Sequence, residues 1–252
     1  MKVIGIIPAR YGSSRFPGKP LADINGKTMI CRVYEQAAKS KSLSHLVVAT
    51  DDQRIMDEVK KFGGNGIMTR NSHRSGTDRC LEALEKLERI NAAEQWDVVV
   101  NIQGDEPFIH PEQIDKVTAC FNIRKEKNAG IQISTLVCKI DEPRELQQPS
   151  VVKVVRQTDG KALYFSRSPI PYFRENTDKP WTRKHDYLKH IGIYGFRASV
   201  LKELVKLSPS PLEIAESLEQ LRWLENGYTI HTEITDKETF SIDTPEDLLK
   251  II

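Results

Sequence analysis

The chain has 252 residues, and its 37 Lys and Arg residues almost balance 35 Asp and Glu residues, for a formal net charge of +2. This balance argues against a general nucleic-acid-binding protein, which would carry a strong basic excess. No apolar run approaches the length of a membrane span, and the first apolar run is too short for a signal peptide. We therefore expect a cytoplasmic protein that binds neither nucleic acid nor membrane.

The first predicted element is a short buried strand, Lys2 to Ile7, and a glycine-containing cationic loop follows it as far as Pro20. The loop contains Gly12, Gly18, Ser13, Ser14 and the cations Arg10, Arg15 and Lys19. Glycines allow close approach of the backbone to a ligand, and guanidinium and ammonium groups bind phosphate. The loop therefore predicts a polyphosphate site, although a surface loop with scattered cations remains an alternative.

The loop differs from the two common nucleotide-binding patterns. Five residues separate Gly12 from Gly18, where the Walker pattern has four, and Pro20 takes the position of its magnesium-binding hydroxyl. The chain also lacks G-x-G-x-x-G after this strand, which argues against a nicotinamide-dependent dehydrogenase.

The first half of the chain continues with alternating strands and helices. Strands are expected at His45 to Thr50 and Asp97 to Ile102, and helices at Gln53 to Phe62 and Gly76 to Ile90. This alternation predicts an α/β fold with a Rossmann-like, mainly parallel sheet and helices on both faces. Ligands of such sheets bind at the carboxyl ends of strands, where the cationic loop and the turn after Ile102 should meet.

The second half predicts a small antiparallel insertion at about 130–195 within a single domain covering 1–252. Strands are expected at 131–139, 151–156, 162–165 and 190–197, with Asp159-Gly160 as a hairpin turn. Residues 169–187 read as a long loop or lid, Leu212 to Glu225 as one helix, and the residues after Asp243 as a final short helix. Cys31, Cys80, Cys120 and Cys138 show no C-x-x-C and no Cys–His zinc spacing, so reduced buried thiols are expected.

Two aspartates are candidate magnesium ligands. Asp105 lies in a Gly-Asp-Glu-Pro turn directly after a buried strand, and Asp243 precedes the last helix. Magnesium usually takes one or two protein carboxylates together with phosphate oxygens and waters. On spacing alone, an ordinary turn residue describes Asp105 equally well, and a capping box from Asp243 to Glu246 is the simpler interpretation of Asp243.

Five motifs in order resemble those of the 3-deoxy-D-manno-octulosonate (Kdo) cytidylyltransferases, or CMP-Kdo synthetases. They lie at residues 8–21, 48–51, 75–79, 101–107 and 242–248, and residues 162–171, 190–197 and 218–222 also match. The resemblance spans residues 3 to 249, and the ordered set is specific although each motif alone is weak. Phe16, where Leu is commoner, and a longer 173–187 segment depart from the pattern.

The resemblance implies a nucleotidyltransferase fold of the glycosyltransferase-A type and a sugar-activating reaction. CTP and Kdo would give CMP-Kdo and diphosphate for lipopolysaccharide biosynthesis, in a homodimer formed through about 150–195. By analogy, Arg10, Arg15 and Lys19 hold the triphosphate, Ser75 and Arg79 lie at the cytosine, and Asp105 and Asp243 hold Mg²⁺. Arg10, Lys19, Asp105 and Asp243 would be the catalytic residues.

The same resemblance places six residues at the sugar: Gln103, Arg167, His190, Tyr194, Glu219 and Gln220. Read by themselves, His190 is an ordinary sheet histidine, Tyr194 a core residue and Glu219 a solvated helix position, whereas Arg167 enters the irregular segment and suits a carboxylate. Three alternatives stay open. These are CMP transfer to amino-Kdo or a sialic acid, a non-catalytic nucleotide-binding regulator, and a glycosyltransferase, for which Gly-Asp-Glu-Pro would be a poor D-x-D motif.

Overall fold

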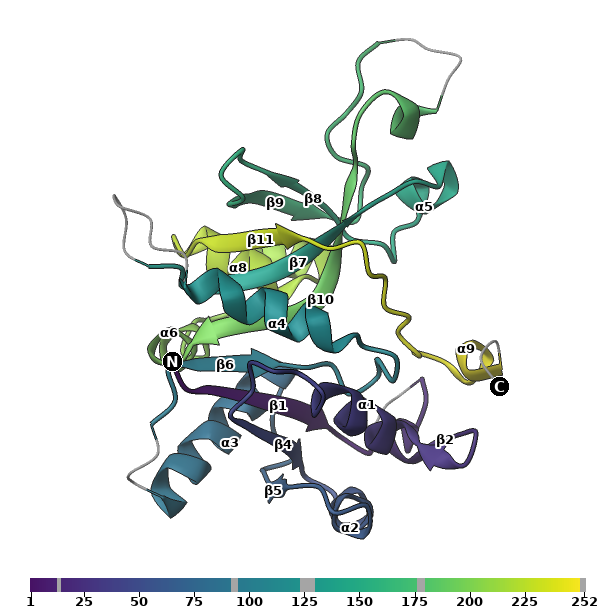
Figure 1. Ribbon diagram of the computed structural model, residues 1–252. Helices are drawn as coiled ribbons and strands as arrows, with labels where there is room; N and C mark the ends of the chain where they lie inside the picture. Colours follow the sequence, from purple (N-terminus) through teal and green to yellow (C-terminus); the bar gives the residue numbers. More distant parts are fainter. Residues whose placement is uncertain (13–14, 92–94, 123–129, 176–179, 250–252) are drawn as a thin grey trace. The chain divides into compact units, whose positions relative to one another are not determined.

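The computed structural model describes residues 1–12, 15–91, 95–122, 130–175 and 180–249, so the loop serines Ser13 and Ser14 lie outside the described residues (Figure 1). The chain forms two compact units. Unit 1 comprises Met1–Thr118, Ile193–Val205 and Thr239–Ile252, and unit 2 comprises Ala119–Gly192 and Lys206–Glu238. Strand β10 (Leu188–Arg197) contributes residues to both units.

Unit 1 contains the predicted parallel sheet. Strand β1 (Val3–Ala9) pairs in parallel with β4 (His45–Thr50) and β6 (Val98–Asn101), and β4 pairs in parallel with β5 (Gly66–Met68). The last residues of β10 pair antiparallel with β6. Almost every residue of β1 is buried, and alternate residues of a strand point to opposite faces, so both faces of this sheet are covered. The prediction of a mainly parallel α/β sheet is confirmed.

The helices of unit 1 follow the strands. They are α1 (Met29–Ala37), α2 (Gln53–Lys61), α3 (Gly76–Ile90), α6 (Ala198–Leu204) and α9 (Pro245–Leu249), with α4 (Pro111–Ala119) ending at the unit boundary. Helices α2 and α3 confirm the predicted helices within one residue. Their starts have local causes, because the side chain of Asp52 accepts from Arg54 N and that of Ser75 accepts from Asp78 N.

A short hairpin next to the cationic loop was not expected. A 3₁₀ turn, Lys19–Leu21, leads into β2 (Asp23–Ile24) and β3 (Lys27–Thr28), which Asn25 and Gly26 connect with φ values of 49° and 81°. Asn-Gly is the usual sequence of such a two-residue turn. Buried Ile24, Met29 and Ile242 pack together here, which ties the C-terminal segment to the loop.

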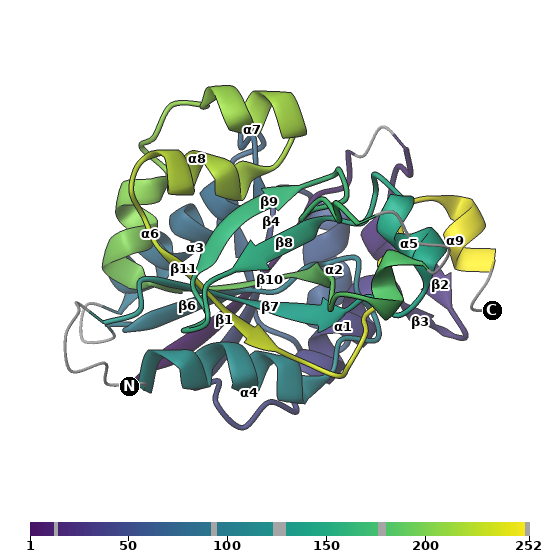
Figure 2. The same cartoon turned by 90° about the horizontal axis from the view of Figure 1, so that it is seen from above.

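Unit 2 holds the remaining strands (Figure 2). Strand β7 (Ile133–Lys139) pairs in parallel with β11 (Ile230–Ile234). Strand β8 (Lys153–Arg156) pairs antiparallel with β9 (Ala162–Ser166) and with the start of β10. Gly160, with φ of 92°, makes the β8–β9 turn, so the antiparallel hairpin predicted there is confirmed.

One predicted helix of unit 2 is wrong. Residues 212–225 form two helices, α7 (Pro211–Glu216) and α8 (Glu219–Glu225), because Ser217 adopts a left-handed conformation with φ of 51° between them. The other short helices are 3₁₀ Cys120–Asn122, α5 (Pro143–Gln147) and 3₁₀ Trp181–Arg183, the last within the predicted irregular segment, of which 176–179 lie outside the described residues. None of the helices in the described ranges combines the length and apolar character that a membrane span requires.

Candidate active site

The cationic loop leaves β1 in a conformation fixed by Tyr11 and Gly18. Gly18 N donates to Tyr11 O at 2.9 Å, and Gly18 has φ of 72°. A Cβ at Gly18 would lie 3.1 Å from the Tyr11 ring, so the close approach and the backbone conformation both favour glycine. The Cζ atom of Arg54, a residue of α2, lies over the Tyr11 ring at 3.3 Å from its centroid. The same guanidinium group donates a hydrogen bond to the Asp52 carboxylate. Residues outside the loop therefore help to hold it in place.

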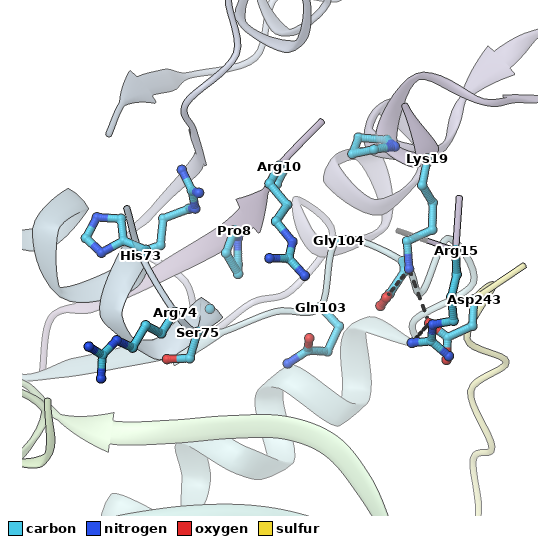
Figure 3. Close-up of a pocket in the computed structure, with 15 residues that line it drawn as sticks. Pro8, Arg10, Arg15, Lys19, His73, Arg74, Ser75, Gln103, Gly104 and Asp243 are labelled. Carbon is cyan, nitrogen blue, oxygen red and sulfur yellow. Dashed lines mark hydrogen bonds and ion pairs between the residues drawn. The ribbon is translucent and has the colours of Figure 1, made fainter. Parts of the chain in front are cut away.

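A pocket of unit 1 brings eight of the predicted residues together (Figure 3). They are Arg10, Arg15, Lys19, Ser75, Arg79, Gln103, Asp105 and Asp243. Arg10 follows β1, Gln103 and Asp105 follow β6, and Ser75 directly precedes α3. The pocket thus lies at the carboxyl ends of β1 and β6, as expected for a parallel sheet. Gly104 is required here, because a Cβ on it would lie 2.8 Å from Pro8 O.

Lys19 lies between the two candidate metal ligands. Its Nζ is 2.6 Å from Asp105 Oδ2 and 3.4 Å from Asp243 Oδ1. Arg15 Nη2 is 3.3 Å from the same Asp243 oxygen. Two carboxylates far apart in the sequence therefore converge on one cationic atom, at the wall of a pocket that also contains Arg10.

The backbone brings Asp243 to this place. Ile242 N donates to Asp105 O at 3.0 Å, and the Ile242 side chain is fully buried with Ile24 and Met29. This pairing joins the turn after β6 to the segment before α9. The two aspartates are therefore positioned by main-chain contact as well as by Lys19.

The capping interpretation of Asp243 is wrong. Helix α9 begins at Pro245, so Thr244 is the residue before it, and Thr244 Oγ1 accepts from Asp247 N at 3.3 Å. Asp247 Oδ2 in turn accepts from Thr244 N at 3.1 Å. Thr244 and Asp247 thus form the reciprocal pair that the sequence analysis assigned to Asp243 and Glu246. The Asp243 carboxylate faces Lys19 and Arg15 instead.

Glu106, next to Asp105, is a buried carboxyl group that the sequence analysis did not single out. It is 5% exposed. Burial, and secondarily the charge of Asp105, raise its pKa to about 7. Glu106 is therefore protonated in a larger fraction of molecules near neutral pH than an ordinary glutamate, which reduces the negative charge beside the two aspartates.

Ser75 and Arg79 are both held by contacts of the fold. Ser75 Oγ caps α3, accepting from Asp78 N at 3.2 Å. Arg79 is 3% exposed, donates to Thr69 Oγ1 at 2.6 Å and pairs with Asp51 at 3.3 Å. Both residues line the pocket while serving these structural contacts. A rigidly held serine and arginine offer fixed hydrogen-bonding groups to a planar ligand.

His73 and Arg74 also line the pocket and were missed. Their only sequence signal is that they directly precede the Ser75-Gly-Thr-Asp-Arg motif. His73 Nε2 contacts Glu82. Burial opposes ionisation of Glu82, but hydrogen bonds from Lys86, Arg70 and His73 outweigh it and lower its pKa to about 2. An ionised Glu82 thus orients the His73 ring in the pocket wall.

The predicted sugar residues are divided between the units. Gln103 lies in the pocket, and Tyr194, 8% exposed, pairs opposite Asn101 on the neighbouring strand of unit 1. The other four, Arg167, His190, Glu219 and Gln220, belong to unit 2. Their role toward a sugar stays a prediction.

Within unit 2, Arg167 and His190 have fixed positions. The Arg167 guanidinium donates to Glu216 O at 2.7 Å, Pro149 O at 2.9 Å and Ser217 O at 3.3 Å. His190 Nε2 lies 2.9 Å from Thr135 Oγ1, and burial lowers its pKa to about 3, so the ring is neutral at physiological pH. Glu219 begins α8, and Gln220 beside it is 5% exposed.

Comparison with known proteins shows the family of the chain. The family model described as cytidylyltransferase matches residues 4–234. The 3-deoxy-manno-octulosonate cytidylyltransferase of Parabacteroides distasonis is 55% identical, covering 100% of this chain and 97% of that protein. The chain belongs to the 3-deoxy-manno-octulosonate cytidylyltransferase family. The family member of Bacteroides thetaiotaomicron is 54% identical, covering 98% of this chain and 96% of its own length.

Solved structures place the fold in the same family. CMP:2-keto-3-deoxy-manno-octonic acid synthetase complexed with CTP matches with a TM-score of 0.88 and 44% identity, covering 100% of this chain and 97% of that one. The 4-diphosphocytidyl-2C-methyl-D-erythritol synthase of Anaerococcus prevotii, at 16% identity and a TM-score of 0.60, shares the fold alone. The resemblance read from the motifs, and the fold that it implied, are confirmed.

Proposed function

We propose that this protein is a nucleotidyltransferase that activates Kdo, converting CTP and Kdo into CMP-Kdo and diphosphate. The observation that carries the proposal is the convergence of Asp105 and Asp243 on Lys19 in a cationic pocket, in a chain of this family. The same proposal includes a cytoplasmic location and a supply of CMP-Kdo for lipopolysaccharide. It also includes a homodimer formed through about 150–195.

In the proposed reaction the anomeric hydroxyl of Kdo attacks the α-phosphorus of CTP. A bond forms between that oxygen and phosphorus, the bond to the β-phosphate oxygen breaks, and the hydroxyl proton is released. Such a transfer needs positioning and charge neutralisation more than covalent catalysis. Arg10, Arg15 and Lys19 supply positive charge to the triphosphate, with Lys19 and Arg10 placed to stabilise the charge that develops on the leaving diphosphate.

Asp105 and Asp243 are the residues that would hold magnesium. The donor set fits this ion, because two carboxylates reach one cationic atom and carboxylate oxygens are ligands that Mg²⁺ prefers. When bound, the ion neutralises phosphate charge and orients the phosphate oxygens. Without the ion, the Lys19 ammonium group keeps the two carboxylates together.

Recognition of the two substrates is assigned to the remaining residues. Ser75 and Arg79, with His73 beside them, would contact the cytosine. Gln103, Arg167, His190, Tyr194, Glu219 and Gln220 would contact Kdo, whose carboxylate suits Arg167 and whose hydroxyls suit amide, phenol and carboxylate groups. The carbonyl partners of the Arg167 guanidinium carry no full charge, so its positive charge remains available to an acid sugar.

Diphosphate release tests the proposal. Each of the four ribonucleoside triphosphates is combined with Kdo, amino-Kdo and a sialic acid in the presence of Mg²⁺. We expect CTP with Kdo to give by far the highest kcat/KM. A preference for another acid sugar would replace Kdo while keeping the reaction, and no release with any pair would support a non-catalytic nucleotide-binding protein instead.

A further inference from the structure

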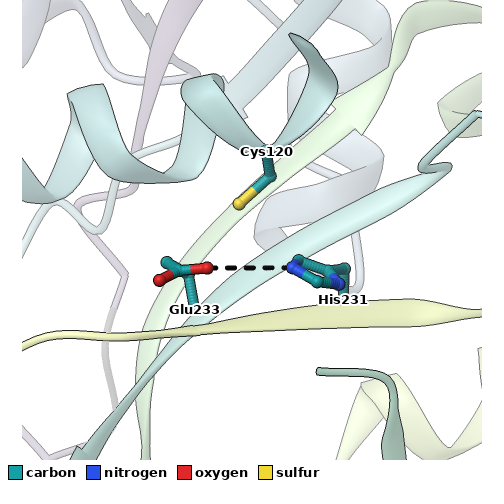
Figure 4. Close-up of side chains that lie close together, drawn as sticks. All are labelled: Cys120, His231 and Glu233. Atoms are coloured by element: carbon teal, nitrogen blue, oxygen red, sulfur yellow. Dashed lines mark ion pairs between the residues drawn. The ribbon is translucent and has the colours of Figure 1, made fainter. Parts of the chain in front are cut away.

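Three side chains of unit 2 gather outside the candidate active site (Figure 4). The ligand atoms of Cys120, His231 and Glu233 all lie within 4.8 Å of one another. Cys120 begins the 3₁₀ turn that follows α4, and the other two lie on β11. Because His231 and Glu233 are two residues apart on a strand, their side chains project from the same face of the sheet.

The fold fixes the orientation of the His231 ring. Gly160, in the β8–β9 turn, has φ of 92°, and a Cβ there would lie 2.6 Å from His231 Cε1. The absence of a side chain at Gly160 therefore makes room for this edge of the ring. His231 Nε2 faces Glu233 at 3.8 Å from Oε2. A ring held in this way presents one nitrogen to the carboxylate.

The three side chains offer donor atoms that a divalent cation takes: a cysteine sulfur, an imidazole nitrogen and a carboxylate oxygen. Cys120 is 2% exposed and His231 7%. A metal ion takes cysteine as the thiolate, so binding here releases the thiol proton.

We propose that Cys120, His231 and Glu233 form a binding site for a divalent transition-metal ion of the zinc type. The geometry supports this assignment, since tetrahedral zinc with bonds of ~2.0–2.3 Å has ligand atoms ~3.3–3.8 Å apart. His231 Nε2 and Glu233 Oε2 are 3.8 Å apart, at the upper end of that range, and all three ligand atoms lie within 4.8 Å of one another, so small side-chain shifts bring them to coordination distance.

The donor set also separates this site from the aspartate pair of unit 1. Sulfur and imidazole nitrogen select zinc, cobalt or copper over magnesium, which takes oxygen ligands. Three protein ligands leave a fourth position for water. A metal bound here ties the turn after α4 to β11, so it stabilises unit 2 by binding only the folded state.

The test uses the tag-free full chain, stripped with a chelator and returned to a buffer with excess Mg²⁺. Addition of Co²⁺ should give a thiolate-to-cobalt charge-transfer band that saturates at one Co²⁺ per chain. Zn²⁺ should abolish the band and raise Tm. Cys120→Ser should lose the band. Cys138→Ser, which removes another buried cysteine of the same unit, is the matched control and should keep it.

Glu233→Gln is a second test variant, at a position that tolerates substitution because Glu233 lies partly at the surface. Losing a ligand should weaken Zn²⁺ binding at least as much as losing an outer-shell partner, about tenfold or more. Circular dichroism checks the fold of each variant without metal. Absence of a band in the wild type, its survival in folded Cys120→Ser, or unchanged affinity in Glu233→Gln would overturn the assignment.

Discussion

Asp243→Asn separates the catalytic role that we propose for this residue from a structural one. Because Thr244 and Asp247 cap α9, the substitution leaves the helix start intact. Among the described residues it weakens two ion pairs, to Lys19 at 3.4 Å and to Arg15 at 3.3 Å, and Asp243 and Arg15 are both substantially exposed. Pairs of this kind contribute about 1 kcal/mol or less each.

The stability change should therefore be small and the activity change large. For a chain of this size 1 kcal/mol shifts Tm by roughly 2–4 °C, so the loss should stay within a few degrees. Removal of a charged ligand that acts on the transferring phosphate should cost about 3 kcal/mol, or two orders of magnitude in kcat. Raising Mg²⁺ should restore turnover only in part.

The assays are diphosphate release at saturating CTP and Kdo, and thermal unfolding of the same preparations. Glu246→Gln, which changes an exposed acid in the first turn of α9, is the matched control and should resemble wild type in both. Thr244→Ala should show the opposite pattern, losing ~1 kcal/mol of stability because it removes the cap. Asp105→Asn should resemble Asp243→Asn, with a double mutant less damaged than the product of the singles. Near-wild-type turnover of Asp243→Asn at low millimolar Mg²⁺ would refute the metal role.

Three further predictions concern single side chains. Lys19→Met should lower kcat by about two orders of magnitude, a larger effect than its effect on CTP binding. It should also tighten Mg²⁺ binding to the two aspartates, which lose the neighbouring positive charge. A change confined to the KM for CTP would contradict a role of Lys19 in the transition state. Arg167→Lys should raise the KM for Kdo and leave that for CTP nearly unchanged, whereas an equal rise in both would exclude a role at the sugar carboxylate. The pKa of Glu106 is raised from 4.5 to about 7 in the folded state, so the folded protein binds this proton more tightly than the unfolded chain does. In urea unfolding without Mg²⁺, the free energy of unfolding of the wild type should therefore fall by up to ~3 kcal/mol between about pH 5 and pH 8. Glu106→Gln should lack this fall, and an equal pH dependence in the variant would show that another group causes it.

The sequence predicts those features that depend on local pattern. The strand at β4 and the helices α2 and α3 follow from apolar periodicity and from the capping residues Asp52 and Ser75. The position of the cationic loop at a strand end follows from the alternation of strands and helices. Ordered motifs then predict eight of the side chains that line the pocket.

Other features depend on contacts that periodicity does not encode. The break at Ser217 lies inside a segment whose apolar spacing suits one helix, and only its left-handed backbone reveals two. The sequence spacing favoured Asp243 as the helix cap, but α9 begins at Pro245, so Thr244 is the residue directly before it. The Asn25-Gly26 turn was overlooked although its sequence signal is strong.

Long-range assembly was the least predictable. His73 acquires its place in the pocket from Glu82, nine residues further along the chain on α3. Cys120 and His231 are separated by more than a hundred residues, so no Cys–His spacing in the sequence indicates a metal site. Folding alone brings them together.

The other predictions depend on the transfer of CMP from CTP to Kdo by this chain. The most direct measurement is phosphorus NMR of the wild-type protein with CTP, Kdo and Mg²⁺, which follows nucleotide, sugar nucleotide and diphosphate together. We expect a CMP-Kdo resonance that grows in equal amount with diphosphate, and only when CTP, Kdo and Mg²⁺ are all present. Diphosphate without CMP-Kdo, or CTP that stays intact over many hours with active controls, would contradict it.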